Sequence, residues 1–299
     1  MWPEPEDPTT TRRMRAAQDR AQTALGVLTD PEPCEVWGWR GRTLSQPVTS
    51  ADGPSWLRIA CLPVGQTDRT FWWGGSLDAE RHIPASVPRP RLRACYDWND
   101  QLLAYRAELY DRETTQPISD SPTVTQPPAL TPSWWAALRT ALDEIAQVPT
   151  HRSTVHQPFL ERAMPRLLGA PVSTYAQSWS TAHGDFHWAN ICGPTLRILD
   201  WEGWGLAPTG YDAAVLHCHS LAVPPLAAQV RHELAHILDT PAGRFAELAA
   251  LTQLLHSVAQ GENLALAGPL QRRAGQLLGR GVPGEGDHKA TTRRWSATG

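Results

Sequence analysis

The hydrophobic pattern changes its period near the middle of the chain, and this change limits the folds that the sequence can adopt. Between residues 34 and 110, short runs rich in β-branched and aromatic residues alternate with turn signals such as the Asp-Gly pair at 52–53. From residue 133 onward, apolar residues recur every three to four positions, as in amphipathic helices. The sequence therefore predicts an α+β protein with a sheet-rich first part and a helical second part.

Five strands and one helix are predicted between residues 34 and 110. Three strands form an antiparallel meander, and two more flank a polar Asn-Asp-Gln turn as a second hairpin. In chain order the predicted strands are CEVW at 34–37, TLSQPVT at 43–49, WLRIACL at 56–62, RACYDW at 93–98 and LLAYRAELY at 102–110. The helix spans 74–83 and ends before Pro84, since proline cannot continue a helix.

Proline, serine and threonine dominate residues 116–132, which show no periodicity and predict a connector between two lobes. An N-terminal extension, residues 1–33, is expected to carry a helix over 10–25 and to precede the first lobe, residues 34–115. The second lobe, residues 133–280, is predicted to have helices at 133–148, 225–239, 242–261 and 263–279. Residues 281–299 have the composition of a disordered tail.

The composition and charge of the chain limit the partners that it is expected to bind. The 299 residues are 41% hydrophobic and carry a net charge of −3 with scattered Lys and Arg, which argues against nucleic acid and anionic membranes as partners. There is no apolar signal core at the N-terminus and no window of 18 apolar residues, so we expect a cytosolic protein, monomeric or weakly dimeric. Five widely spaced cysteines predict buried free thiols.

Two polar segments lie between apolar runs in the second part, HGDFHWAN at 183–190 and ILDWEGWG at 198–205. Asp185 and Asn190 bracket the first segment, and a tight hairpin with a Gly-Pro-Thr turn is expected to fold Asp200 back towards them. Two carboxylates and an amide oxygen suit Mg²⁺, which prefers one or two carboxylates together with substrate phosphates. The remaining carboxylate can accept a proton from a nucleophile.

The order His-Gly-Asp, four residues, Asn, and then a hairpin ending in Asp resembles the catalytic segment of the aminoglycoside phosphotransferase and choline kinase group. The resemblance covers about residues 34–280 and is specific over 183–202. It implies a bilobal protein-kinase-like fold, with a small antiparallel-sheet N-lobe and a mostly helical C-lobe. It also implies transfer of the γ-phosphoryl group of ATP or GTP to a hydroxyl of a small molecule, such as an aminoglycoside or another sugar-containing antibiotic or metabolite.

This resemblance implies a role for each residue of the two segments. Asp185 matches the catalytic base, which orients the acceptor hydroxyl and takes its proton, and Asn190 and Asp200 match the Mg²⁺ ligands. His183 and His187 are expected to support the loop by hydrogen bonds. The acceptor side is expected to include Trp201, Glu202 and Asp212.

The resemblance also implies a nucleotide site in the first lobe, but the match there is loose. Arg58 stands where a kinase-like site has a phosphate-binding Lys, and strand alternation places it on the face opposite Leu57 and Ile59. Glu80 is its expected helix partner, with Asp78 as the alternative. A solvated Arg and a solvated Glu remain the competing interpretation.

Two further parts of the expected nucleotide site depend on backbone groups. Gly38 and Gly41 belong to a short loop that would cover the phosphates, although the loop lacks the Gly-x-Gly-x-x-Gly pattern. The backbone from Glu108 to Tyr110 is expected to meet the adenine edge. Because these matches are loose, a kinase-like ligand-binding protein with weak or no catalysis is the first alternative function.

A zinc hydrolase is the second alternative, because HELAH at 232–236 matches the helical HExxH signature. In that signature the two His bind zinc and the Glu acts as a general base. The position where a third ligand is expected, nineteen residues after the second His, is Leu255. The phosphotransferase motif accounts for far more of the chain.

Overall fold

The structure is a computed structural model that describes residues 3–31, 34–67 and 70–283. The chain forms two compact units. The first unit consists of the residues up to Ile83, of Pro88–Gln116 and of Arg197–Glu202, and the second consists of Pro84–Val87, of Pro117–Leu196 and of the chain from Gly203 onward. The segment with Asp200 thus groups with the sheet of the first unit, although it follows loop 183–190 in the sequence. Most of the tail predicted at 281–299 lies outside the described residues.

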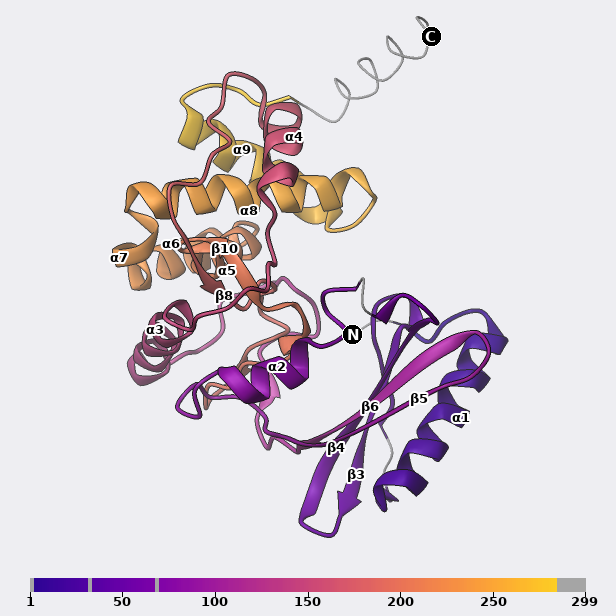
Figure 1. Cartoon of the computed structure of the whole chain (residues 1–299). Coiled ribbons are helices and arrows are strands. Elements are labelled where there is room, and N and C mark those ends of the chain that lie inside the picture. The colour runs from indigo at the N-terminus through magenta and orange to yellow at the C-terminus, as the bar shows by residue number, and fades with distance from the viewer. Residues whose placement is uncertain (1–2, 32–33, 68–69, 284–299) are drawn as a thin grey trace, which may run out of the picture. The chain divides into compact units, whose positions relative to one another are not determined.

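An antiparallel sheet of six strands forms the centre of the first unit (Figure 1). Its order is β1–β3–β4–β6–β5, with β2 beside β3. The strands are β1 (Leu28–Thr29), β2 (Val36–Trp37), β3 (Thr43–Ser50), β4 (Gly53–Pro63), β5 (Leu92–Asn99) and β6 (Leu103–Asp111). The five strands and both hairpins expected from the sequence are present, and β1 adds a short edge. Helix α2 (Gly75–His82) follows β4, as predicted.

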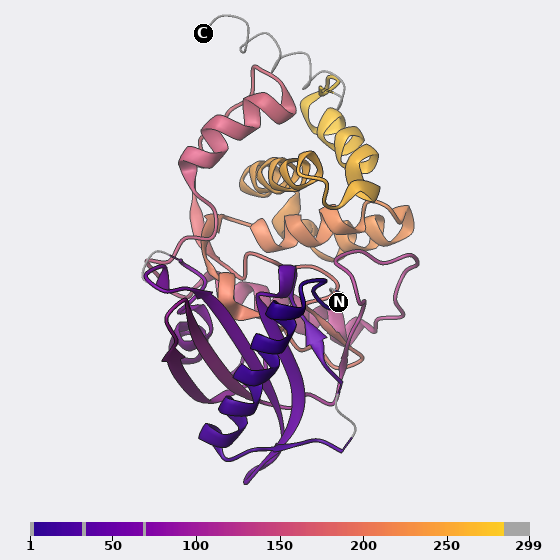
Figure 2. The same cartoon turned by 90° about the vertical axis from the view of Figure 1, so that its right-hand side faces the viewer.

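Helix α1 (Pro8–Leu25) covers one face of this sheet (Figure 2). Asp7 caps its N-terminus by accepting bonds from two backbone N–H groups, and Gly26 ends it in the left-handed conformation. The buried face of the helix packs on the β4 residues Leu57 and Ile59, both fully buried. Each of these two side chains contributes about 2 kcal/mol by leaving water. The opposite face of β4 is therefore the one that presents Arg58.

The second unit is mostly helical and is built around α8 (Pro241–Ala259), which contacts α4, α5, α7 and α9. Its other helices are α3 (Pro132–Ala146), α4 (Gln157–Leu168), α5 (Tyr211–Ser220), α6 (Pro224–Glu233), α7 (Ala235–Leu238) and α9 (Ala267–Leu278). Short strands β8 (Trp179–Ala182) and β10 (Gly205–Pro208) pair antiparallel. The remaining short strands are β7 (Gln116–Pro117) and β9 (Cys192–Gly193).

The sequence-based predictions differ from the helices of the second part in three places. The helix expected over 225–239 is interrupted at Leu234, and the fully buried α5 was missed because a helix buried on all sides has no amphipathic period. Helix α4, which contains Pro165, was missed because proline argues against a helix interior. The backbone N–H of Ile198 donates to the carbonyl of Pro88, and the tight hairpin expected to end at Asp200 stays a prediction.

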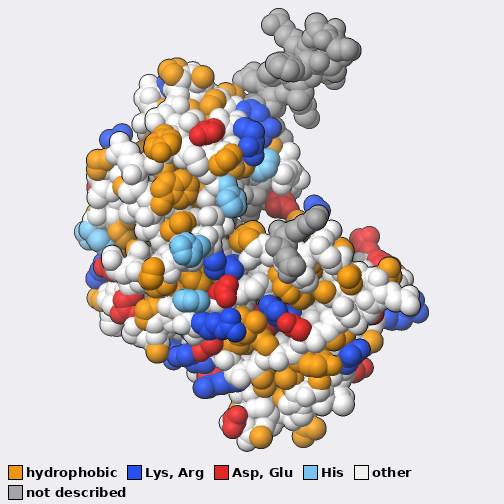
Figure 3. Space-filling model, in the orientation of Figure 1, with side chains coloured by type: hydrophobic (Ala, Val, Ile, Leu, Met, Phe, Trp, Pro, Cys, Tyr) orange, Lys and Arg blue, Asp and Glu red, His pale blue; other side chains and the backbone are white. Residues whose placement is uncertain are grey.

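The distribution of charged side chains and the state of the cysteines agree in part with what the composition predicts. Side chains of both signs are interspersed on the face drawn in Figure 3. All five cysteines are free, and two of them are buried, but Cys34 is exposed, against expectation. Among the described residues, no helix has the length and apolar character that a membrane crossing requires.

Candidate functional site

Loop 183–190 leaves strand β8 through a glycine that no other residue can replace without strain. Gly184 has a φ of 91°, and a Cβ at this position would overlap the hydroxyl of Thr154. The turn brings the backbone close to Thr154 and directs the next side chain, Asp185, away from the core. The glycine of the His-Gly-Asp motif is thus explained by backbone geometry.

Asp212, in the first turn of α5, fixes the start of the loop. Its Oδ2 accepts a bond of 2.7 Å from the backbone N–H of His183, and its Oδ1 accepts one of 2.9 Å from that of Gly184. Burial raises the pKa of Asp212, and the charge of His183 and the two N–H donors oppose this effect. Both oxygens are used on the loop, so the sequence-based placement of Asp212 on the acceptor side is corrected to a supporting role.

The side chain of Asp185 is 62% exposed at the tip of this turn. Its Oδ2 lies 3.3 Å from Nε2 of His187 and accepts a hydrogen bond of 3.2 Å from Nδ2 of Asn190. Desolvation works to raise the pKa of Asp185, but the imidazoles of His187, His183 and His219 outweigh it, and the pKa lies well below its usual range. The carboxylate is therefore ionised at neutral pH and open on one side.

The amide of Asn190 is oriented by the same carboxyl-bearing residue. Its Nδ2 donates to the backbone carbonyl of Asp185 at 2.9 Å as well as to the side chain. Because the nitrogen is committed to these two acceptors, the oxygen Oδ1 is the atom of the amide that can serve as a ligand. An amide oxygen beside a carboxylate fits the hard oxygen donors that Mg²⁺ prefers.

The buried side chains of His183 and His187 support loop 183–190. His183 is fully buried, packs edge-on against Phe186, and accepts at Nδ1 a 3.4 Å bond from the backbone N–H of Asp185. His187 meets His219 of α5, with ring centroids 5.4 Å apart. Burial and the His187 ring lower the pKa of His219 to about 3, against the opposing charge of Asp185. Sequence reasoning missed His219, because helical spacing alone does not show which of His217 and His219 faces the loop.

Arg58 lies on the polar face of β4, directly opposite Glu108 of β6. Its Nη1 donates to Glu108 Oε2 at 3.0 Å, and its Nη2 pairs with Glu202. Burial works to lower the pKa of Arg58, but the carboxylates of Glu202, Glu108 and Asp200 hold it well above its usual value. Arg58 is thus a permanently charged, half-buried cation surrounded by carboxylates.

The expected pairing of Arg58 with Glu80 is not formed. Glu80, in α2, binds Arg89, Arg91 and the backbone N–H of Leu92 instead. Burial works to raise the pKa of Glu80, and the two arginines outweigh it and lower the pKa. The physical reason is local, because the segment directly before β5 places Arg89 and Arg91 next to α2. Asp78, the alternative partner, lies within 3.9 Å of Arg81.

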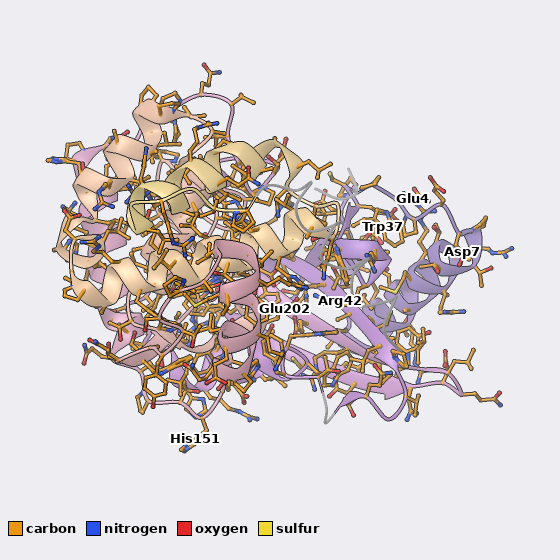
Figure 4. All side chains as sticks on the ribbon, turned by 90° about the horizontal axis from the view of Figure 1, so that it is seen from above. Glu4, Asp7, Trp37, Arg42, His151 and Glu202 are labelled. Carbon is orange, nitrogen blue, oxygen red and sulfur yellow. The ribbon has the colours of Figure 1, made fainter. Side chains whose placement is uncertain are left out.

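Glu202, in the short 3-10 helix Trp201–Gly203, joins Arg42 and Arg58 within the first unit. Figure 4 shows Arg42 and Glu202 next to one another. Burial and the neighbouring Asp200 raise the pKa of Glu202, whereas the two guanidinium groups lower it, and the net direction is upward. Glu202 was expected on the acceptor side, and its partners are instead the cations of the sheet. Sequence reasoning missed Arg42 altogether.

Asp200 and Trp201 directly precede Glu202 in the sequence. Asp200 adopts a left-handed φ of 58°, a conformation that aspartate tolerates better than most other residues. Trp201 is buried, and its indole N–H donates to the carbonyl of Ile198 at 2.9 Å. Trp201 was expected on the acceptor side, and its side chain is instead buried beside the turn around Asp200.

The glycine loop, residues 38–42, is held by backbone hydrogen bonds. Gly38 donates its backbone N–H to the carbonyl of Thr43, and Gly41 donates to the carbonyl of Gly38, which closes a 3-10 turn over Trp39–Gly41. A Cβ at Gly38 would overlap the side chain of Thr43, and one at Gly41 would overlap Pro5. The two glycines are required for these close approaches, so their presence does not by itself point to a ligand.

Glu108 and Tyr110 lie in β6, where both residues have partners on the two neighbouring strands. Strand β6 lies between β4 and β5, and Glu108 is paired with Arg58 on one side and Cys95 on the other. Tyr110 is likewise paired with Trp56 and Leu92, and its hydroxyl donates to Glu108 at 2.9 Å. The adenine contact expected from Glu108 to Tyr110 stays a prediction, at the C-terminal end of β6.

The HELAH segment does not form the helix that its zinc interpretation requires. Helix α6 ends at Glu233 and α7 begins at Ala235, so the two histidines belong to different helices. Glu233 is held by Arg139 at 2.5 Å. Within residues 3–31, 34–67 and 70–283, no group of three or more His, Cys, Asp or Glu side chains is gathered for a metal.

Comparisons with known proteins bear on the fold. No protein-family model matches the sequence, and no curated protein matches it. The chain is similar in structure to a microcompartment-associated aminopropanol kinase, with a TM-score of 0.53 and 14% identity over 87% of this chain and 95% of that one. A spectinomycin phosphotransferase in complex with ADP and spectinomycin gives a TM-score of 0.48 and 11% identity over 87% and 92%.

An ethanolamine kinase from Plasmodium vivax gives a TM-score of 0.43 and 9% identity, over 91% of this chain and 89% of that one. The aminopropanol kinase carries the argument, because its likeness extends over nearly the whole length of both chains. The antiparallel sheet and the helical second unit both belong to the shared architecture. The α+β, protein-kinase-like fold predicted from the sequence is confirmed.

Proposed function

We propose that this protein is a phosphotransferase that moves the γ-phosphoryl group of ATP or GTP to a hydroxyl group of a small molecule. The observation that carries the proposal is the state of Asp185. Its carboxylate is ionised, 62% exposed and held by Asn190 and His187 at the tip of a turn that Asp212 anchors. A fixed, open carboxylate is what the acceptor hydroxyl of such a reaction requires.

In the proposed reaction, Asp185 accepts a hydrogen bond from the acceptor hydroxyl, orients its oxygen towards the γ-phosphorus, and takes the proton as the new O–P bond forms. The bond from the γ-phosphorus to the oxygen that bridges to the β-phosphate breaks, and ADP or GDP leaves with the electron pair of that bond. A carboxylate with a lowered pKa is a weak base. Such a base suits a loose transition state, in which the acceptor needs orientation more than early deprotonation. His183 and His187 position Asp185 and do not need to exchange protons.

Asn190 and Asp200 are the residues that we propose to hold Mg²⁺, through the amide oxygen Oδ1 and the carboxylate. Magnesium, when bound, neutralises charge on the nucleotide phosphates. Arg58 is proposed as the phosphate-binding cation of the first unit, a task for which its planar guanidinium offers paired donors. The acceptor is proposed to be an aminoglycoside, another sugar-containing antibiotic or metabolite, or an amino alcohol, as the aminopropanol kinase of the same fold suggests.

The test is a screen with ATP or GTP, Mg²⁺ and a panel of amino alcohols, sugars and amino sugars. The Asp185→Asn variant is expected to lower kcat by about 100-fold to 10,000-fold with the chosen acceptor. Asp143→Asn, which changes an exposed carboxylate of α3, is the matched control and is expected to keep full activity. Full activity in Asp185→Asn contradicts the proposal.

A binding protein of the same fold that does not turn over is the second candidate. The observation in its favour is that Arg58 is engaged by both Glu108 and Glu202. Nucleotide binding with no transfer to any acceptor of the panel would favour this candidate.

A further inference from the structure

Two guanidinium groups of the first unit share a single carboxylate. Nη2 of Arg42 pairs with Oε1 of Glu202, and Nη2 of Arg58 pairs with Oε2. We call Arg42 and Arg58 the arginine fork. Two guanidinium groups around one anion with several oxygens form the arrangement by which proteins bind phosphate, because planar N–H donors match both carboxylate and phosphate oxygens.

The fork is held in place from several sides. The guanidinium carbon of Arg42 lies 4.0 Å from the ring centroid of Trp72, and Arg58 is fixed by its bond of 3.0 Å to Glu108. The side chains of the two arginines are 27% and 15% exposed, so one end of the fork reaches solvent. The buried Nε of Arg42 has no hydrogen-bond partner among the described residues, so one donor of the fork is unused.

Glu202 differs from Glu108 in how it is held. Its backbone packs against the first turn of α2, where a Cβ on Gly75 would overlap the carbonyl of Glu202. Its carboxylate, in a side chain that is 13% exposed, pairs with Arg42 through Oε1 and with Arg58 through Oε2. Because the backbone of Glu202 stays in place, a rotation of its side chain is enough to let a phosphate group replace the carboxylate at the fork. The strands do not have to move.

The charges around the arginine fork also indicate that Glu202 and a phosphate group compete for it. Arg42 and Arg58 are balanced by Glu202 and Glu108, so a phosphate group approaching the fork meets no net positive charge while Glu202 stays in place. When Glu202 turns away, one negative charge leaves the fork, and Nη2 of both Arg42 and Arg58 becomes available to an incoming anion. An entering phosphate group therefore has to compete with Glu202.

We propose that the arginine fork binds a phosphate group of the nucleoside triphosphate, and that Glu202 competes with this phosphate for the fork. Arg42 then acts as a second phosphate-binding residue beside Arg58, and Glu202 sets the affinity. The identity of the phosphate donor rests on the proposed function. The competition itself does not, because any polyphosphate of suitable size reaches the same two arginines.

The experiment uses the full chain and tripolyphosphate as the probe, with dissociation constants measured by titration calorimetry. Glu202→Gln removes the competing charge and is expected to tighten binding by about tenfold. Arg42→Gln is expected to weaken binding by about tenfold, also in the Glu202→Gln background. Glu113→Gln is the matched control, because it removes a carboxylate of the same unit that pairs with Arg197, and it is expected to leave the affinity unchanged.

Unchanged or weaker binding in Glu202→Gln, or no effect of Arg42→Gln, overturns the proposal. If Glu202→Gln does not fold, Glu202→Ala takes its place, because it also removes the competing carboxylate and is also expected to tighten binding. The probe needs neither an acceptor nor phosphoryl transfer, so a failed acceptor screen leaves this result intact. Conversely, if the protein is an active kinase and neither substitution changes its KM for the nucleotide, the proposal for the arginine fork is refuted. The proposed function is then unaffected.

Discussion

The carboxylate of Glu247 in α8 and the imidazole of His217 in α5 form a buried hydrogen bond of 2.8 Å. Arg273 of α9 adds two bonds to the same carboxylate, of 2.6 and 2.9 Å, and Arg231 of α6 lies 3.5 Å away. Four helices of the second unit are thereby joined at a side chain that is fully shielded from solvent. This cluster is separate from loop 183–190, and it makes the stability of the helical unit dependent on pH.

Acid is expected to weaken the helical unit through Glu247. Burial works to raise its pKa, but His217 and Arg273 outweigh this effect and lower the pKa from 4.5 to about 2. A depressed folded pKa gives stability that is present above pH 4.5 and is lost as the pH falls towards 2, in total on the order of 3 kcal/mol. The free energy of unfolding of Glu247→Gln and of the wild type should therefore differ most at pH 7 and converge below pH 4. Glu161→Gln, an exposed carboxylate of α4, serves as the control, and a difference that does not change with pH contradicts the assignment.

Replacing Asp212 by Asn is expected to loosen the start of loop 183–190. One of the two carboxylate oxygens becomes an amide group that faces a backbone N–H, so one buried hydrogen bond is lost at a cost of about 1–3 kcal/mol. The proposed base Asp185 loses its fixed position, and kcat should fall while the nucleotide KM stays nearly constant. Kinetics and thermal unfolding measured on the same preparation check this. A loss of stability without a loss of kcat would show that the anchor does not position Asp185.

Three glycine-to-alanine substitutions separate the two costs that are expected at Gly184. One is the strain of a positive φ, and the other is the overlap of the added Cβ with Thr154. Gly184→Ala combines a φ of 91° with overlap on Thr154 and is expected to cost at least about 2 kcal/mol in the free energy of unfolding. Gly261→Ala has a similar φ of 89° and open space, so it should cost about 1 kcal/mol. Gly203→Ala has neither feature and should be nearly neutral. Chemical denaturation measures all three, and equal costs at 184 and 261 would show that the overlap is relieved.

Removal of zinc is expected to have no effect on this protein. His232 and His236 are exposed and belong to different helices, and Glu233 is engaged by Arg139. Thermal unfolding should be the same with and without a zinc chelator, and His232→Ala should change the free energy of unfolding by less than about 0.5 kcal/mol. Stoichiometric zinc that is lost in His232→Ala would restore the hydrolase interpretation.

Periodicity and turn chemistry were sufficient to predict most of the elements. The strands and helices around Leu57 and Ile59 were found because one face of each element is buried, and the period of the pattern records this. The helices without such a contrast were missed: α5 is buried on every side, and α4 contains an internal proline. The helix predicted over 225–239 was too long, because its break at Leu234 leaves no signal in the apolar pattern.

For the candidate site, the sequence by itself determined which residues lie close together within loop 183–190. The tertiary structure decided which side chains from distant parts of the chain pair with one another. The spacing of Asp185 and Asn190 within one loop fixes their hydrogen bond, because five residues of chain allow few other arrangements. The sequence did not determine that Arg58 pairs with Glu108 and Glu202 and not with Glu80, or that Arg42 joins them. These pairings connect residues up to 160 positions apart. Side-chain charge specifies that a partner of opposite sign is needed, but only the packing of strands, helix α2 and the turn at Asp200 selects which carboxylate lies within reach.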